Sequence, residues 1–291
     1  MKTRPIPYKT IEYTEGKYIP YLHFPALDEA GIVSHLFTTR LGGVSEGIFA
    51  TMNLSSNRGD DKEKVLENYR RVAMQLGCEE KDFCFSDQTH TTNIRVITEE
   101  DRGKGMVLPQ DYKDIDGIIT NVPGIALGTF YADCVPLYFV DPVHRAIGLS
   151  HSGWRGTVGR MGEVTIREMN RTYGSDAKDL LCAIGPSICV SCYEVSTDVA
   201  EEFIRAFGIK NTPAWDGQGN DPYTILWKKE NDKWQLNLWA ANVQVLRDAG
   251  IHAENISVSN VCSACNPDLL FSHRATKGKR GNCGAFMMLK P

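Results

Sequence analysis

The chain has 291 residues, of which 42% are hydrophobic, 23% charged and 9% aromatic, and its formal charge is −4. This composition is typical of a globular protein with a large apolar core. It lacks the basic face that duplex-binding proteins carry and any apolar run of about 18 residues that could span a membrane, so we expect neither a nucleic-acid nor a membrane partner. The polar amino end and nine irregularly spaced cysteines indicate a cytoplasmic protein with thiols and no disulfide framework.

The first half of the chain is predicted to be rich in strands, with one helix among them. That helix begins with an aspartate able to cap it, has apolar residues at helical spacing and stops at Gly77. In chain order we predict a strand at 31–39, a helix at 60–77 and strands at 83–85, 94–97, 115–120, 125–130, 137–140 and 146–150, with a charged surface excursion at 99–114.

The second half is predicted to be richer in helices. In chain order we predict a helix at 158–173, a strand at 180–184, helices at 197–207 and 236–249, and strands at 256–261 and 286–289, with a polar insertion at 211–222. Strand pairs and helices alternate irregularly, which favours an α+β fold with a mixed sheet over a doubly wound parallel fold. No linker or repeat is apparent, so residues 1–291 are predicted to form one domain.

Three residues that could bind a metal stand where apolar strands give way to turns. Cys134 and His151 could face each other at one edge of a sheet, and His90 follows an earlier strand. Catalytic zinc sites use three such ligands and leave a fourth position for water or substrate. Spacing alone indicates this site only weakly, because a single histidine or cysteine is more often structural. Cys134 could instead be a nucleophile with His151 as its base.

Two further cysteine pairs have the spacing of metal ligands. Cys189-x-x-Cys192 and Cys262-x-x-Cys265 could together form a four-thiolate zinc site. Sixty-nine residues separate the two pairs, far more than a compact zinc ribbon needs, so we expect packed thiols here. His35 lies within an apolar strand and is predicted to be a core histidine.

Several longer motifs occur in a fixed order along the chain and resemble one known family. They are Thr38–Gly47, Met52–Leu54, Asp87–His90, Ala132–Pro136, His151–Thr157, Ile184–Ile188, Cys192–Val195, Leu236–Asn242 and Phe271–Arg274. This pattern resembles the laccase-domain ("polyphenol oxidase") family, also described as purine nucleoside phosphorylases, over roughly residues 30 to 289. Thr91 and Ser152 depart from the family's usual Gly and Ala, and Asn282-Cys283 replaces an expected polar or basic pair.

The resemblance implies a fold, a metal and an activity. The fold would be a layered α/β/β/α arrangement with mixed β-sheets, like the cytotoxic-necrotizing-factor-like cysteine hydrolases. The metal would be zinc held by the positions matching His90, Cys134 and His151, with copper as the alternative from older descriptions. The ligand chemistry favours zinc, because a multicopper oxidase needs many more histidines than the seven present.

The implied activity is phosphorolysis of purine nucleosides with inorganic phosphate. The substrates would be adenosine, inosine, guanosine and 5′-methylthioadenosine, and adenosine deamination would be a second activity. A copper-dependent phenol oxidase and a non-catalytic metal-binding protein are the alternative functions.

Catalytic roles are expected for four residues around the implied metal. Cys134 and His151 would act from the metal site itself, where zinc lowers the pKa of a bound water to about 7. Asp133 is the nearest carboxylate in sequence and is expected to shuttle the proton that deamination needs. Arg155 is expected to act on the phosphate, since arginine forks suit that anion.

Substrate binding is assigned to Arg40, Arg155 and Trp154. Arg40 lies on a glycine-rich loop, and Trp154 could stack on a purine, as could Tyr131 and Phe130, although core packing explains these aromatic residues equally well. Two further phosphate candidates are Arg58, for which a surface ion pair is expected, and Arg274. The short basic cluster ending at Arg280 is predicted to be a solvated turn that could also contact a phosphate.

Overall fold

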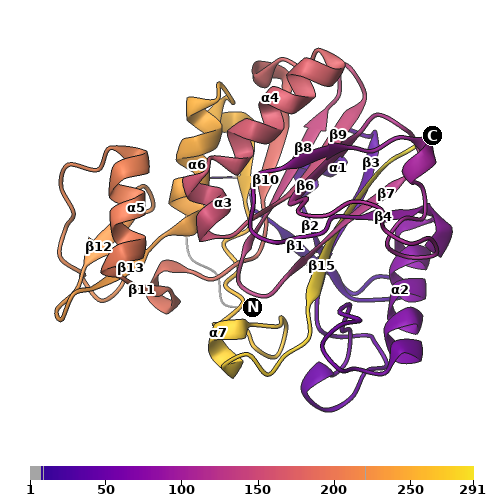
Figure 1. Ribbon diagram of the computed structural model, residues 1–291, viewed down its shortest axis with the longest axis horizontal. Coiled ribbons are helices and arrows are strands. Elements are labelled where there is room, and N and C mark those ends of the chain that lie inside the picture. Colours follow the sequence, from indigo (N-terminus) through magenta and orange to yellow (C-terminus); the bar gives the residue numbers. More distant parts are fainter. Residues whose placement is uncertain (1–7, 9, 220) are drawn as a thin grey trace.

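The computed structural model describes residue 8 and residues 10–219 and 221–291, which form two large sheets and one small one (Figure 1). The first sheet has the order β1-β2-β3-β15-β7-β4 and contains parallel and antiparallel pairs. Its strands are β1 (Glu12–Thr14), β2 (Tyr21–His23), β3 (Val33–Thr38), β15 (Cys283–Leu289), β7 (Ala126–Tyr131) and β4 (Phe83–Phe85).

The second sheet is also mixed and has the order β14-β10-β8-β9-β6-β5. Its strands are β14 (Ile256–Val258), β10 (Leu181–Ile184), β8 (Val135–Asp141), β9 (Ala146–Ser152), β6 (Gly117–Thr120) and β5 (Ile94–Val96). The hairpin β8–β9 closes on Asp141, whose Oδ1 accepts hydrogen bonds from the backbone N–H groups of Val143 and His144 at 2.9 and 3.0 Å. This hairpin pairs Pro136 with His151, so the start of β8 and the end of β9 lie at one sheet edge.

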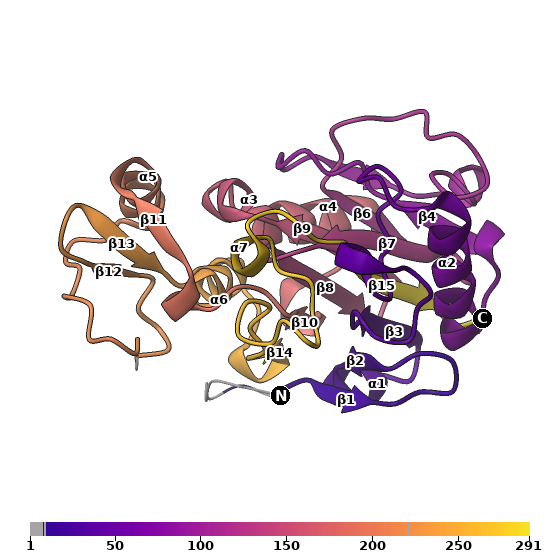
Figure 2. The same ribbon diagram turned by 90° about the horizontal axis from the view of Figure 1, so that it is seen from below.

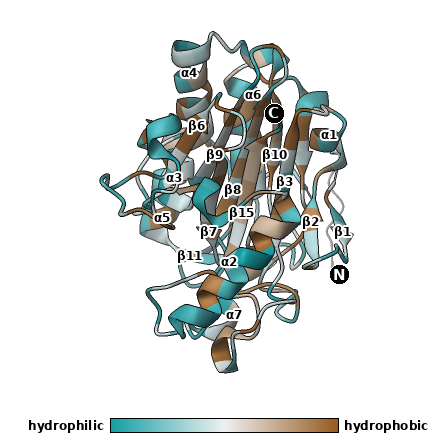
Figure 3. Cartoon of the chain, turned by 90° about the vertical axis from the view of Figure 1, so that its right-hand side faces the viewer, coloured by the Kyte–Doolittle hydropathy of each residue, from teal (hydrophilic) through white to brown (hydrophobic). Residues whose placement is uncertain are grey.

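The helices are α1 (Pro25–Asp28), α2 (Lys62–Leu76), α3 (Trp154–Val158), α4 (Met161–Tyr173), α5 (Thr197–Phe207), α6 (Leu238–Asp248) and α7 (His273–Thr276). Of these, α2, α4 and α6 cover the outer faces of the two large sheets. One core lies between α2 and the first sheet, a second between the two sheets, and a third between the second sheet and α4 and α6. The order of layers is therefore α/β/β/α, and apolar residues concentrate along the strands (Figure 3).

A smaller unit, which we call the lobe, projects to one side of the layered body (Figures 1 and 2). It consists of α5 and a three-stranded antiparallel sheet of β11 (Glu194–Ser196), β13 (Lys233–Leu236) and β12 (Leu226–Lys228). The apolar face of α5 packs Phe203 into the third core. The prediction from sequence missed all three strands of this small sheet.

The predicted helices and most predicted strands are confirmed within a few residues. Asp61 caps α2 by accepting a hydrogen bond from the backbone N–H of Glu63, and Gly77 ends the helix in the left-handed conformation with φ 80°. The extra short helix α3 precedes α4 and was not predicted. No helix within the described residues is both apolar enough and long enough to cross a lipid bilayer.

Candidate metal centre and cavity

The three predicted metal ligands meet at one edge of the second sheet. The ligand atoms of His90, Cys134 and His151 all lie within 4.8 Å of one another, and Cys134 Sγ is 3.9 Å from His90 Nε2. Cys134 comes from the turn before β8, His151 from the end of β9, and His90 from the loop after β4. One sulfur and two imidazole donors fit a tetrahedral ion with an open fourth position, so these three side chains could hold one.

Asp116, which the sequence did not single out, fixes two of these ligands. Its Oδ1 lies 2.7 Å from His151 Nδ1, which leaves Nε2 of that imidazole for a metal. Its carboxylate also accepts hydrogen bonds from the backbone N–H groups of Thr89, His90 and Thr91 at 3.0, 3.1 and 2.8 Å. Burial alone would raise the pKa of Asp116, but His151 and the backbone donors hold it below its ordinary value.

The pairing of two strands explains how Asp116 reaches the site. It precedes β6, and β6 pairs with β9 so that Gly117 lies opposite Ser150. The backbone N–H of His151 donates to the carbonyl of Asp116 at 2.7 Å. In the sequence, Asp116 could be noticed as an aspartate directly before a buried strand. Its role can be predicted only once it is known that this strand pairs with the strand that carries His151.

The thiol and imidazole of the site influence each other's ionisation. Burial alone would raise the pKa of Cys134, but His151 and His90 lower it to about 6. Burial would lower the pKa of His151, but Cys134 and Asp116 raise it to about 9. The thiolate form of Cys134, which is the form that binds a metal, is therefore stabilised by its surroundings.

Because Gly153 has no side chain, His90 and Cys134 can occupy the space next to it. A Cβ atom at this position would lie 2.9 Å from His90 Cδ2 and 3.2 Å from Cys134 Sγ. Both distances are shorter than ordinary van der Waals contact. A side chain here would displace the ligands, so the glycine of the Gly-Trp-Arg-Gly segment has a steric role.

Asp133 holds the turn beside Cys134 in place. Its Oδ1 accepts a hydrogen bond from Ser263 Oγ at 2.6 Å, and its Oδ2 accepts one from the backbone N–H of Arg274 at 2.7 Å. Its own carbonyl accepts from the backbone N–H of Ile188 at 3.0 Å. Both carboxylate oxygens thus contact neighbouring loops, an arrangement that suits a positioning residue better than the proton shuttle expected from sequence.

A cavity of about 380 Å³ opens beside the three ligands, within the range of small-molecule pockets. Its walls combine aromatic rings, two arginines and several amides and hydroxyls. Among the described residues the lining consists of Leu54, Ser55, Ser56, Asn57, Arg58, Tyr69, Phe85, Ser86, Asp87, Gln88, His90, Gly105, Gln110, Phe130, Ala132, Cys134, His151, Arg280 and Asn282.

Three residues predicted to bind substrate do not line this cavity. Arg40 donates from Nε to the carbonyl of Ala50 at 2.8 Å and from Nη1 to that of Pro267 at 2.7 Å, so it bridges two loops. Arg155 is exposed and stacks on Trp154, with 4.3 Å from its guanidinium carbon to the ring centroid. Both predictions rested on the motifs in which these arginines stand. In the fold, Arg40 contacts backbone carbonyls and Arg155 contacts the Trp154 ring.

The cavity arginines are Arg58 and Arg280, the first of which had been expected to form a surface ion pair. Burial and the neighbouring charge of Arg58 lower the pKa of Arg280 to about 10. Arg280 donates to the side chain of Asn282 and to the carbonyl of Gly281, but its buried Nε has no hydrogen-bond partner among the described residues. This pair of cations is suited to bind an anion.

Of the predicted aromatic residues, only Phe130 lines the cavity. Gln88 holds the Phe130 backbone on both sides, accepting from its N–H at 2.7 Å and donating to its carbonyl at 2.8 Å. Tyr131 points into the core and donates its hydroxyl to the carbonyl of Ser150 at 3.1 Å.

Comparison with known proteins gives one consistent set of relatives. Residues 34–290 match the family described as multi-copper polyphenol oxidoreductase laccase. The purine nucleoside phosphorylase YlmD of Bacillus subtilis is 34% identical over 258 residues, covering 87% of each chain. The adenosine deaminase RL5 of an unknown prokaryotic organism is 36% identical over 241 residues, covering 82% of this chain and 87% of its own.

Solved structures agree with this result. The crystal structure of YlmD from Geobacillus stearothermophilus superposes with a TM-score of 0.84 at 30% identity and covers 98% of this chain and all of its own. The Bacillus licheniformis hypothetical protein YfiH superposes with a TM-score of 0.85 at 32% identity, covering 96% and 99% of the two chains.

Proposed function

This chain belongs to the multi-copper polyphenol oxidoreductase laccase family, and we propose that it is a purine nucleoside phosphorylase with adenosine deaminase as a side activity. The observation that carries the proposal is a cavity in which a three-ligand metal centre, two arginines and an aromatic wall converge. Its substrates would be adenosine, inosine, guanosine or 5′-methylthioadenosine together with inorganic phosphate. The nine thiols favour a reducing compartment, in keeping with a cytoplasmic location.

Phosphate would bind between Arg58 and Arg280. An anion there would neutralise two neighbouring cations and give the buried Nε of Arg280 the acceptor that it lacks among the described residues. Asn282 accepts from the Arg280 guanidinium and would fix its orientation. In this proposal Arg58 and Arg280 bind the phosphate, the role that the sequence suggested for Arg40 and Arg155.

The purine would stack on the aromatic wall near Phe85 and Phe130. Base–aromatic stacking contributes about 1–3 kcal/mol per base and does not depend on which purine is bound. The clamp of Gln88 on the Phe130 backbone would hold this ring while the nucleoside binds. A cavity that stacks the ring in this way suits the several purines in the proposed substrate range.

The donor set at His90, Cys134 and His151 fits zinc better than copper, because one thiolate and two imidazoles with an open position are typical of catalytic zinc. Zinc held there would supply Lewis-acid activation of water for adenosine deamination. Asp116 would keep His151 in the tautomer that presents Nε2 to the cavity. Asp133 would act as a positioning residue for the turn that carries Cys134.

A second candidate chemistry is favoured by the ionisation of Cys134, whose pKa is lowered to about 6. A thiolate beside an imidazole is the arrangement of cysteine hydrolases, and the layered fold would then be related to the necrotizing-factor-like members of that class. Iodoacetamide separates the two roles. Alkylation of Cys134 in fully metal-loaded protein, with loss of activity, would favour the nucleophile, whereas protection by the metal supports a ligand.

Product analysis tests the proposed function. Pure zinc-loaded protein is incubated with adenosine, with and without phosphate, and the products are separated by chromatography. We expect adenine and ribose 1-phosphate only with phosphate. Inosine should form in both reactions, and with phosphate part of it should be split further to hypoxanthine. Absence of both adenine and inosine would refute the proposal, and oxygen uptake with a phenol in copper-loaded protein alone would favour the oxidase.

The arginine assignment has its own test. Arg58→Gln and Arg280→Gln should each raise the KM for phosphate at least tenfold, because each removes a charge from the cavity. Arg171→Gln, on the exposed face of α4, serves as the matched control and should leave this KM unchanged. If Arg155→Gln raised the KM for phosphate more than Arg280→Gln did, the phosphate would bind near Arg155, as expected from the sequence.

A further inference from the structure

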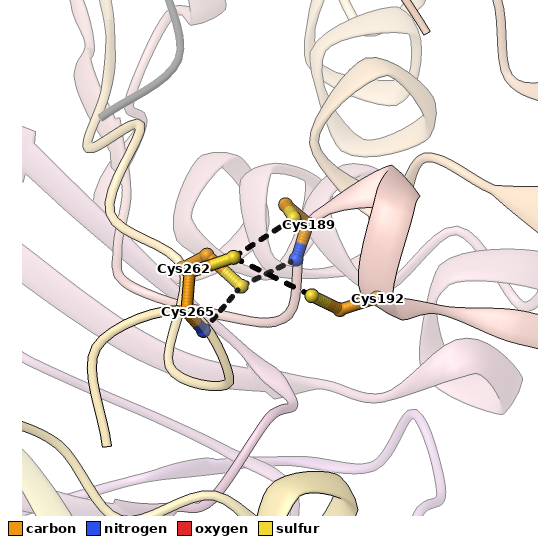
Figure 4. A group of neighbouring side chains, drawn as sticks. All are labelled: Cys189, Cys192, Cys262 and Cys265. Carbon is orange, nitrogen blue, oxygen red and sulfur yellow. Dashed lines mark hydrogen bonds between the residues drawn. The ribbon is translucent and has the colours of Figure 1, made fainter. Parts of the chain in front are cut away.

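We propose that the chain binds a second, structural zinc ion through four thiolates. Cys189, Cys192, Cys262 and Cys265 bring their sulfur atoms within 4.8 Å of one another at the base of the lobe (Figure 4). Cys189 and Cys262 are buried and the other two are half-buried. All four positions are occupied by protein ligands, as in closed structural zinc sites and unlike the open centre at His90, Cys134 and His151.

The distances between the sulfurs match a tetrahedral ion better than disulfides. Zinc–sulfur bonds of about 2.3 Å in tetrahedral geometry place the sulfurs about 3.8 Å apart. Cys265 Sγ lies 3.9 Å from Cys189 Sγ and 3.4 Å from Cys192 Sγ. One sulfur thus has two neighbours at similar distances, whereas a disulfide pairs each sulfur with one partner at about 2.05 Å.

The sheet explains why 69 intervening residues do not prevent this site. Strands β10 and β14 are parallel neighbours, with Ile184 opposite Val258. Each cysteine pair follows the carboxyl end of one of these strands. Backbone hydrogen bonds continue the pairing, from Ser187 N to the carbonyl of Val261 at 3.3 Å and from Ser263 N to that of Ser187 at 3.0 Å. The four thiols therefore meet, although the separation of the two pairs along the chain does not suggest it.

The backbone around the cluster stabilises a thiolate. The N–H groups of Cys189 and Cys265 both point at Cys262 Sγ, at 3.2 and 3.4 Å. Such donors offset the negative charge that sulfur carries when it binds a metal. Arg274 adds a cation at the edge of the cluster, since its Nη1 donates to the carbonyl of Cys192 at 3.2 Å.

The proposed ion would connect three parts of the molecule. Cys192 ends the 3₁₀ turn Val190–Cys192, which leads directly into the lobe at β11. Cys262 and Cys265 belong to the loop after β14. Both loops also hold Asp133, through the N–H of Ile188 and the hydroxyl of Ser263. A zinc ion here would therefore fix the lobe and, through Asp133, the turn that carries Cys134.

Metal analysis of the full-length protein tests the proposal. Protein purified from zinc-supplemented cells should contain two zinc ions per chain by plasma mass spectrometry. Cys192→Ser/Cys265→Ser should contain one, Cys134→Ala should contain one, and Cys78→Ser, a cysteine outside both clusters, should contain two. One ion in the wild type that is lost from Cys134→Ala but kept in the double variant would overturn the proposal. So would iron with visible absorption, or disulfides among the four residues.

If Cys192→Ser/Cys265→Ser does not fold, replacing zinc by cobalt tests the four-thiolate site in another variant. In Cys134→Ala, cobalt should give the intense thiolate charge-transfer band and tetrahedral d–d bands of a four-sulfur site. A spectrum with no thiolate band in this folded variant would refute the site. Because this readout does not depend on turnover, it remains informative if the proposed nucleoside chemistry fails.

Discussion

Asp116 is fully buried, and it fixes the positions of two of the three candidate metal ligands. It holds the ring of His151 from one side and the backbone of His90 from the other. His90 adopts φ 68°, a left-handed conformation that is uncommon for a residue with a side chain. Such a conformation persists only where neighbouring contacts enforce it, and here the Asp116 carboxylate provides them.

We predict that Asp116→Asn lowers metal affinity about 10–100-fold, as loss of a carboxylate partner of a ligating histidine does. An asparagine keeps the size of the side chain but can direct an NH₂ group at His151. Competition with a coloured chelator measures the affinity. Asp114→Asn is the matched control, because Asp114 lies in the same loop and accepts from Thr89 Oγ1 without touching His151. Equal affinities for both variants would contradict the role assigned to Asp116.

Gly153→Ala tests whether the ligands need the space above the glycine. The added Cβ would meet the His90 ring at 2.9 Å, so we expect a loss of metal affinity of at least tenfold in a protein with an unchanged circular dichroism spectrum. Gly156→Ala, in the helix α3 that follows Gly153, is the control, since its Cβ would meet no atom closer than 3.4 Å. If Gly153→Ala binds metal as tightly as the wild type, the site tolerates a shift of His90 and the steric argument fails.

At the scale of elements, Arg40 joins the loop after β3 to the loop before α7. Its guanidinium donates to the carbonyls of Ala50 and Pro267 and lies 4.7 Å from the ring centroid of Phe271. Segments more than 200 residues apart in the sequence are held together in this way. The Arg40 guanidinium therefore fixes the geometry of the two loops that it joins.

Arg40→Gln should therefore lower the free energy of unfolding by about 3 kcal/mol, since it removes two hydrogen bonds from a charged donor. The KM for phosphate should stay within twofold of the wild type. Urea denaturation and steady-state kinetics on the same preparation give both values. A variant of wild-type stability with a strongly raised KM would instead place Arg40 in the phosphate site.

At the scale of the whole molecule, one buried histidine makes stability depend on pH. His35 is buried against Phe24 and Tyr138, and its Nε2 accepts a hydrogen bond from the Phe24 N–H at 2.9 Å. Burial lowers its pKa to about 4. The unfolded chain takes up a proton near pH 6.5, so the contribution of His35 is complete above that pH and is lost as the pH falls towards 4.

We predict that the wild type loses about 2 kcal/mol more than His35→Gln when the pH falls from 7 to 5, because only the wild type has this group to protonate. Urea unfolding in the presence of a chelator gives the difference free of metal effects. His252→Gln, which changes an exposed histidine, should follow the wild type. A parallel loss in His35→Gln would show that other groups carry the acid sensitivity.

The sequence predicted elements well and spatial neighbours poorly. Helix α2 follows from its cap, its apolar periodicity and its glycine stop, which are all local signals. The meeting of His90, Cys134 and His151 was expected because each follows a strand. Asp116, Arg280 and the four-cysteine cluster depend on which strands are paired, and pairing is not local information. The separation of Cys192 and Cys262 along the chain gave no sign that they lie side by side.

Strand β15 has a consequence for the order in which the protein can fold. It comes last in the chain among the described strands, yet it lies between β3 and β7 and pairs with both. Until residues 283–289 leave the ribosome, these two older strands present open, apolar edges of the kind that invite pairing with other chains. Assembly of the first sheet therefore has to wait for β15, and a nascent chain stalled before this strand is the species that chaperones would need to protect.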